Sequence, residues 1–123
     1  FNPNHATRDV GNAYASTQRA WWVYPRRHQL GLPAGSHMGN GCQWADSARA
    51  LGYWVDNTPR HVGDIIVFAA GQEGSDSYYG HVAIVEKIND DGSIVTSESG
   101  ASLNGGTYSR TLTNVGGFQY IHY

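Results

Sequence analysis

Apolar and polar residues recur with a helical period near the start of the chain. Apolar residues between positions 18 and 29 predict a helix that begins near Gln18, takes Ser16 or Thr17 as its N-cap and ends at about position 30. Pro25 lies inside this stretch and is expected to kink or restart the helix, because proline has no amide proton to donate.

A second helical pattern follows a glycine-rich loop. Trp44, Ala48 and Leu51 are spaced so that they share one face of a helix over 43–51. Gly52 follows directly, and glycine is the residue that most often ends a helix. The first half of the chain is therefore predicted to be helical.

The second half of the chain has the pattern of strands. Strands are expected over 64–70, 81–88, 93–97, 107–112 and 118–123. The first of these has four consecutive apolar residues, typical of a buried central strand, and Asn-Asp-Asp-Gly at 89–92 predicts a tight hairpin turn. We therefore expect one α+β domain over 1–123, with N-terminal helices packed on an antiparallel sheet of five or six strands.

Composition narrows the classes of function. The chain has 123 residues, 40% of them hydrophobic, and a net charge of −2, so it can bury a core and lacks the basic surface that nucleic acids require. No apolar run is long enough to span a membrane. The only paired basic residues, Arg26-Arg27, are expected on an exposed helix face.

Cysteine use is minimal. Cys42 is the only cysteine, which excludes an internal disulfide and a cysteine-rich zinc site. Two interpretations of Cys42 stay open: a small, partly buried apolar residue, or a nucleophile.

His81 and Glu98 are the strongest candidates for chemistry. A hairpin folded about positions 90–91 brings them almost opposite each other on neighbouring strands, at the end of a loop rich in Gly and Tyr. A carboxylate there can bond one ring nitrogen and leave the other free as a base. An exposed cross-strand charge pair is the equally open structural alternative.

A thiol nucleophile at a helix N-terminus would complete such a site, because the helix dipole lowers the pKa of the thiol. The first helix offers Arg19 and Ala20 at its start, and neither carries a thiol. The second helix has Cys42 near its start.

Five segments, in order along nearly the whole chain, resemble the CHAP (cysteine, histidine-dependent amidohydrolase/peptidase) domain. They are Trp21-Trp22-Val23-Tyr24 with Arg26-Arg27, Gly39-Asn40-Gly41 with Gln43-Trp44, Pro59 with Gly63-Asp64-Ile65-Ile66-Val67-Phe68, Gly80-His81-Val82-Ala83-Ile84-Val85-Glu86, and Ser97-Glu98. The resemblance implies a papain-like fold, secretion or cell-wall association, and action on peptidoglycan as an amidase or endopeptidase. It implies no cofactor, and no metal is expected, since Asn2, Asn4 and Asp9 supply too few carboxylates for calcium.

The resemblance also implies residue roles. His81 corresponds to the base and Glu98 to the acid that orients it, whereas the nucleophile position is occupied by Arg19. Many members have Asn where this chain has Gly100. Arginine stays protonated and cannot attack a carbonyl carbon, so activity is expected to be impaired or lost. We expect Arg19 to pair with Glu98, and Cys42 is the alternative nucleophile.

Three functions follow from this combination. The chain is a peptidoglycan hydrolase domain, a catalytically silent module that binds the stem peptide or glycan, or a module that docks a protein partner. Candidate groove residues are Trp21, Trp22, Asn40, Trp44, Tyr78, Tyr79 and Gly80.

Overall fold

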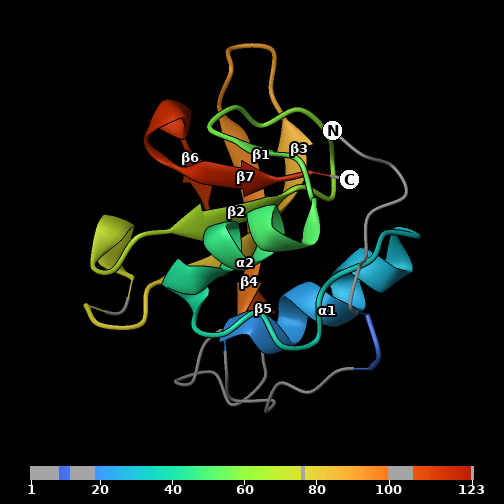
Figure 1. Ribbon diagram of the computed structural model, residues 1–123. Coiled ribbons are helices and arrows are strands. Elements are labelled where there is room, and N and C mark those ends of the chain that lie inside the picture. Colours follow the sequence, from blue (N-terminus) through green and yellow to red (C-terminus); the bar gives the residue numbers. More distant parts are fainter. Residues whose placement is uncertain (1–8, 12–18, 76, 100–106, 123) are drawn as a thin grey trace.

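The computed structural model describes residues 9–11, 19–75, 77–99 and 107–122, and it confirms that helices precede strands (Figure 1). The helical elements are α1 (Arg19–Gln29), the 3-10 turn η1 (Gly41–Gln43) and α2 (Trp44–Leu51). The strands are β1 (Val55–Asp56), β2 (Ile65–Phe68), β3 (His81–Ile88), β4 (Ile94–Ser99), β5 (Thr107–Tyr108), β6 (Thr111–Leu112) and β7 (Gln119–Ile121). The 3-10 turns η2 (Gln72–Gly74) and η4 (Val115–Gly117) lie between strands. The expected N-cap residues Ser16 and Thr17 lie outside the described residues.

The strands form one antiparallel sheet in the order β1-β7-β2-β3-β4-β5, and β6 also pairs with β4. The sheet has seven strands, so the expected number is slightly too low. The sequence does not predict β1, because two residues are too few to show an alternating pattern. The strand expected over 107–112 is interrupted at Ser109 and Arg110 and becomes β5 and β6.

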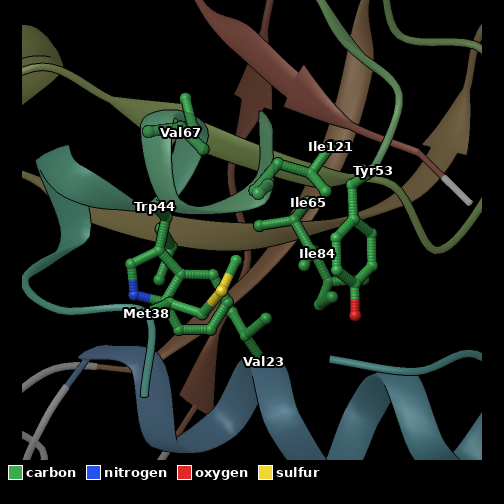
Figure 2. Close-up of a cluster of buried hydrophobic side chains, with 11 residues drawn as sticks. Val23, Met38, Trp44, Tyr53, Ile65, Val67, Ile84 and Ile121 are labelled. Carbon is green, nitrogen blue, oxygen red and sulfur yellow. The ribbon is translucent and has the colours of Figure 1, made fainter. Parts of the chain in front are cut away.

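The sheet has two buried faces. Side chains of β2 and β3 alternate between them, as strand geometry requires. Figure 2 shows the first face, where Val23 of α1 and Trp44 of α2 meet residues of the sheet. The members of that cluster are Val23, Met38, Trp44, Ala45, Ala48, Tyr53, Ile65, Val67, Val82, Ile84 and Ile121. The second face buries Ile66, Phe68, Ala83, Val85, Ile94, Leu112, Phe118 and Tyr120.

Helix α1 continues through Pro25 instead of restarting there. A proline in a helix interior costs about 3 kcal/mol. Val23 and Tyr24, before Pro25 in the chain, and Arg27, after it, are buried. The packing of Val23 against the sheet and the hydrogen bonds of Arg27 help to offset this cost.

The expectation that Arg26-Arg27 marks an exposed helix face is wrong. Arg27 is fully buried and donates hydrogen bonds to the carbonyl oxygens of Pro33, at 2.9 Å, and Gly63, at 2.8 Å. Arg26 pairs with Glu86 at 2.7 Å. Both guanidinium groups therefore fasten α1 to its surroundings, which their charge alone could not reveal.

The hairpin between β3 and β4 is confirmed. The Asn89 amide donates to Ser93 O at 2.8 Å, and Gly92 has a φ of 89°, a left-handed conformation that favours glycine. A β-bulge between Val85 and Lys87 shifts the register by one residue. This hairpin fixes which residues of the two strands face each other at the far end.

No helix in the described ranges is long and apolar enough to cross a membrane.

Candidate active site

His81 is the first residue of β3 and pairs with Phe68 at the end of β2. Its side chain is only 4% exposed, and the centre of its ring lies 5.1 Å from the centre of the Phe68 ring. Gly80 precedes it with a φ of 68°, and a Cβ added there would lie 2.6 Å from Phe68 O. A Cβ added at Gly41 would lie 2.6 Å from the His81 backbone nitrogen. Two glycines therefore allow the chain to close tightly around the His81 backbone.

Glu98 contacts His81 as the strand pairing predicted. Ile84 pairs with Ser97, so continuing the register places Glu98 opposite Ala83 and diagonal to His81, on the same face. His81 Nε2 lies 2.8 Å from Glu98 Oε1, and the Glu98 side chain is fully buried. The pair is therefore a buried contact rather than an exposed cross-strand charge pair.

Arg110 is a component of the site that the sequence did not predict. Its Nη2 lies 2.7 Å from Glu98 Oε1 and its Nε lies 2.8 Å from Oε2, a two-pronged pairing. The guanidinium carbon lies 5.0 Å from the centre of the Phe68 ring, and Nη1 donates to Glu73 O at 2.8 Å. Its only signal in the sequence is that 107–112 could pair beside the Glu98 strand.

Glu98 stays ionised under all ordinary conditions. Burial alone would raise its pKa, but hydrogen bonds from His81, Arg110 and Thr96 outweigh burial and lower the pKa from 4.5 to about 2. An ionised carboxylate at Nε2 favours the tautomer with its proton on that nitrogen. Nδ1 is then the ring atom that can accept a proton.

The first turns of α1 lie against β4. Trp22 Nε1 donates to Ser97 Oγ at 2.9 Å, and Ser97 is the neighbour of Glu98 in β4. Arg19 is the first residue of α1, one turn before Trp22. The position expected for the nucleophile therefore belongs to the helical turn that precedes the contact of Trp22 with β4.

The expected ion pair between Arg19 and Glu98 involves a side chain outside those the structure describes. Both oxygens of Glu98 already have described partners, with Oε1 bound by His81 and Arg110 and Oε2 by Arg110 and Thr96. The pairing of Arg19 with Glu98 stays a prediction.

Cys42 lies next to the segment that leads into His81. Its amide donates to Tyr79 O at 2.8 Å, and its Sγ lies 3.9 Å from Tyr78 O. The Cys42 thiol therefore points toward the backbone of the loop that precedes β3. Among the described residues, no hydrogen bond joins the Cys42 sulfur to the His81 ring.

The family model described as the CHAP domain matches residues 9–100. The chain belongs to the CHAP domain family.

Relatives in Staphylococcus aureus match this CHAP domain along most of its length. The probable autolysin LDP is 39% identical over 121 residues, covering 98% of this chain and 41% of that protein. The staphylococcal secretory antigen SsaA is 39% identical over 114 residues, covering 90% of this chain and 41% of that protein. The chain therefore spans less than half the length of these curated relatives.

A solved structure shares the fold. The crystal structure of an N-acetylmuramoyl-L-alanine amidase from Staphylococcus aureus superimposes with a TM-score of 0.85 at 37% identity, covering 99% of this chain and 34% of that one. The papain-like α+β fold is therefore confirmed.

The CHAP domain does not hold all expected groove residues at its surface. Trp44 is 0% exposed and belongs to the core, so its ring cannot line a groove. Trp21 and Trp22 are half-buried, Gly80 is buried and Asn40 is exposed. Tyr78 and Tyr79 are exposed, directly before His81, and their rings meet edge to face at 4.8 Å.

Metal-binding side chains gather elsewhere. Of the expected weak calcium candidates, Asn2 and Asn4 lie outside the described residues, and Asp9 contacts His28 at 2.6 Å. The group among the described residues whose atoms could hold a metal is His61, Asp64 and His122. These residues flank the start of β2, whereas His81 pairs with its end.

Proposed function

We propose that this CHAP domain acts at bacterial peptidoglycan with an intact base and orienting acid, and that hydrolysis is lost or strongly reduced because Arg19 occupies the nucleophile position. The contact that supports this most directly is the buried His81–Glu98 pair, whose Nε2 to Oε1 distance is 2.8 Å. Arg110 and Thr96 hold Glu98 from the other side. These contacts support the proposed roles of His81 as the base and Glu98 as the orienting acid.

The missing step is nucleophilic attack. In this chemistry His81 would take the proton of a thiol, and the imidazolium formed would protonate the leaving amine. Arginine carries a permanent charge and no free lone pair, so it cannot form the acyl bond. A fixed positive charge near His81 also disfavours the imidazolium. Binding can survive this substitution, whereas catalysis cannot.

The relatives support a proposal for the substrate class. Proteins described as an autolysin and an N-acetylmuramoyl-L-alanine amidase are similar to this chain over 98% and 99% of its length. We therefore propose peptidoglycan as the ligand, bound through its stem peptide or the adjoining muramic acid, with secretion or attachment to the cell wall. The exposed rings of Tyr78 and Tyr79 offer flat apolar surfaces for such a ligand.

A second candidate is hydrolysis with Cys42 as a relocated nucleophile. It is favoured by the contacts of Cys42 with Tyr78 and Tyr79, which precede His81 in the chain by three and two residues. Catalysis tolerates little misplacement, since about 1 Å can cost roughly a hundredfold in rate. The direction of the thiol toward Tyr78 O therefore places this candidate second.

The two candidates separate in one experiment on the purified chain. Co-sedimentation with insoluble peptidoglycan measures binding, and clearing of cell walls in a gel measures lysis. We expect binding without lysis. Lysis that disappears in Cys42→Ala would support the second candidate, and absence of binding would contradict both.

A further inference from the structure

A second cluster of chemically active side chains lies at the opposite end of β2 from His81. His61 and Asp64 belong to the turn before β2, and His122 follows β7. They meet because β7 pairs with both β1 and β2, and because the His122 amide donates to Trp54 O at 2.8 Å. One ligand atom from each of the three residues lies within 4.8 Å of the other two.

His122 is the most constrained member. It is fully buried, and its Nε2 lies 2.7 Å from Asp56 Oδ1. Its Nδ1 lies 2.8 Å from Asp64 Oδ2 and yet forms no hydrogen bond, since the oxygen is off the line of the N–H direction. A buried ring nitrogen thus points into the cluster, with contact to a carboxylate but without an aligned hydrogen bond.

Asp64 is equally fixed. Its Oδ2 accepts the backbone amides of Arg60 and His61, each at 2.8 Å, and its side chain is 3% exposed. Its Oδ1 lies 3.7 Å from His61 Nδ1, too far for a hydrogen bond. One oxygen is therefore held by the backbone while the other faces an imidazole without bonding it.

Two imidazoles and one carboxylate form the ligand set that suits zinc. Asp56 at the far nitrogen of His122 supplies the carboxylate that commonly orients a metal-bound histidine. Asp56 partly neutralises the charge of Arg60, because Arg60 Nε pairs with Asp56 Oδ2 at 2.8 Å. The Arg60 guanidinium carbon also lies 4.6 Å from the centre of the Trp54 ring.

His61 is the member of the cluster that is exposed to solvent and able to move. Its side chain is 62% exposed, so a cation can reach the cluster from solvent on that side. Ligand atoms on one zinc ion lie closer together than 4.8 Å, because each bond is about 2.0–2.2 Å long. Rotation of the exposed His61 ring can supply this contraction while Asp64 and His122 stay in place.

We propose that His61, Asp64 and His122 form a zinc-binding site, with the fourth position open to water or another small ligand. The site is independent of the His81–Glu98 pair and of any hydrolysis. The proposal differs from the expectation based on the sequence, which was that the chain binds no metal. A proton competes with zinc for His122 Nδ1. Burial lowers the pKa of His122, but the contacts with Asp64 and Asp56 raise it by more than burial lowers it, so the pKa lies above its usual value.

The test is calorimetric titration of the tag-free, chelator-treated chain with zinc chloride at pH 7.5, with magnesium chloride as the comparison. We expect one zinc ion per chain with micromolar affinity and no heat from magnesium. At a hundredfold excess over the dissociation constant, zinc should raise the melting temperature by about 5 °C or more.

Variants locate the ion. His61→Ala should weaken zinc binding at least about a hundredfold, since it removes one of three ligands. His61 is exposed, so this variant should fold as the parent does. His37→Ala is the matched control, because His37 is also exposed and is not in the cluster. Zinc binding that survives in His61→Ala, or a parent chain that binds no zinc at neutral pH, would overturn the proposal.

Discussion

Arg110 should be the principal stabiliser of the buried Glu98 carboxylate. Glu98 is fully buried, and Arg110 makes the 2.7 Å and 2.8 Å contacts to its two oxygens. Arg110→Met keeps the bulk of the side chain and removes the charge. Breaking a fully buried ion pair costs about 3–5 kcal/mol. Because the Arg110 side chain is 28% exposed, we expect a smaller loss, about 2–3 kcal/mol of unfolding free energy at pH 7.

The pH dependence of this loss has a defined sign. Glu98 has a folded pKa of about 2, below the ordinary 4.5, so its contribution is present above pH 4.5 and is lost as the pH falls through 2. Without Arg110 the folded pKa rises toward the ordinary value, so Glu98 gains its proton at a higher pH. The difference between parent and variant should therefore be about 1 kcal/mol smaller at pH 3 than at pH 7.

Urea unfolding followed by tryptophan fluorescence at both pH values measures these quantities. Arg49→Met is the matched control, because Arg49 is exposed and pairs with the exposed Asp46, so the expected loss is below about 1 kcal/mol. A loss for Arg110→Met that is equal at pH 3 and pH 7, or no larger than that of Arg49→Met, would refute the assignment of Glu98 as a buried, ionised partner.

Three further changes probe other parts of the structure. Gly41→Ala should destabilise the chain by about 2 kcal/mol or more in urea unfolding, because the new Cβ would lie 2.6–2.9 Å from the His81 backbone. Gly116→Ala is the control and should be neutral, because a Cβ at Gly116 would have no atom within 4 Å. Equal effects of the two substitutions would contradict the close packing of Gly41 on His81. Arg27→Met should lower the free energy of unfolding by about 2–4 kcal/mol in the same assay, because the buried carbonyl oxygens of Pro33 and Gly63 would lose their hydrogen-bond donors. A loss as small as that of Arg49→Met would show that these hydrogen bonds contribute little. Replacing Tyr78 and Tyr79 together by Ala should weaken co-sedimentation with peptidoglycan about fivefold at unchanged stability, because both rings are exposed. Val62→Ser is the control, at an exposed apolar residue near the other end of β2, and should leave binding intact. Equal binding by both variants would exclude the tyrosines from the binding surface.

Strong local patterns predicted the fold well. The four apolar residues of β2, the Asn-Asp-Asp-Gly turn and the glycine after α2 each depend on neighbours in sequence, and each lies where it was expected. The expected restart at Pro25 and the expected exposure of Arg27 were wrong. Proline is unfavourable inside a helix, and the charge of arginine is unfavourable to bury, so only the contacts of α1 with the sheet and with Gly63 O reverse these expectations.

The site was predictable as far as one hairpin extends. His81 and Glu98 belong to adjacent strands joined by a short turn, so register alone brings them together. Arg110 lies beyond the 100–106 segment, between β5 and β6, and no local pattern fixes how these two short strands pair with β4. The same holds for His61, Asp64 and His122, which meet because the last strand inserts between β1 and β2.

Arg19→Cys tests the central claim most directly. If the base side of the site is intact and only the nucleophile is missing, the variant should lyse purified cell walls, and lysis should vanish in Arg19→Cys combined with His81→Ala while persisting in Arg19→Cys combined with Cys42→Ala. The parent chain should bind the walls without lysing them. An Arg19→Cys variant that folds and binds but stays inactive, or a parent chain whose lysis requires Cys42, would contradict the account.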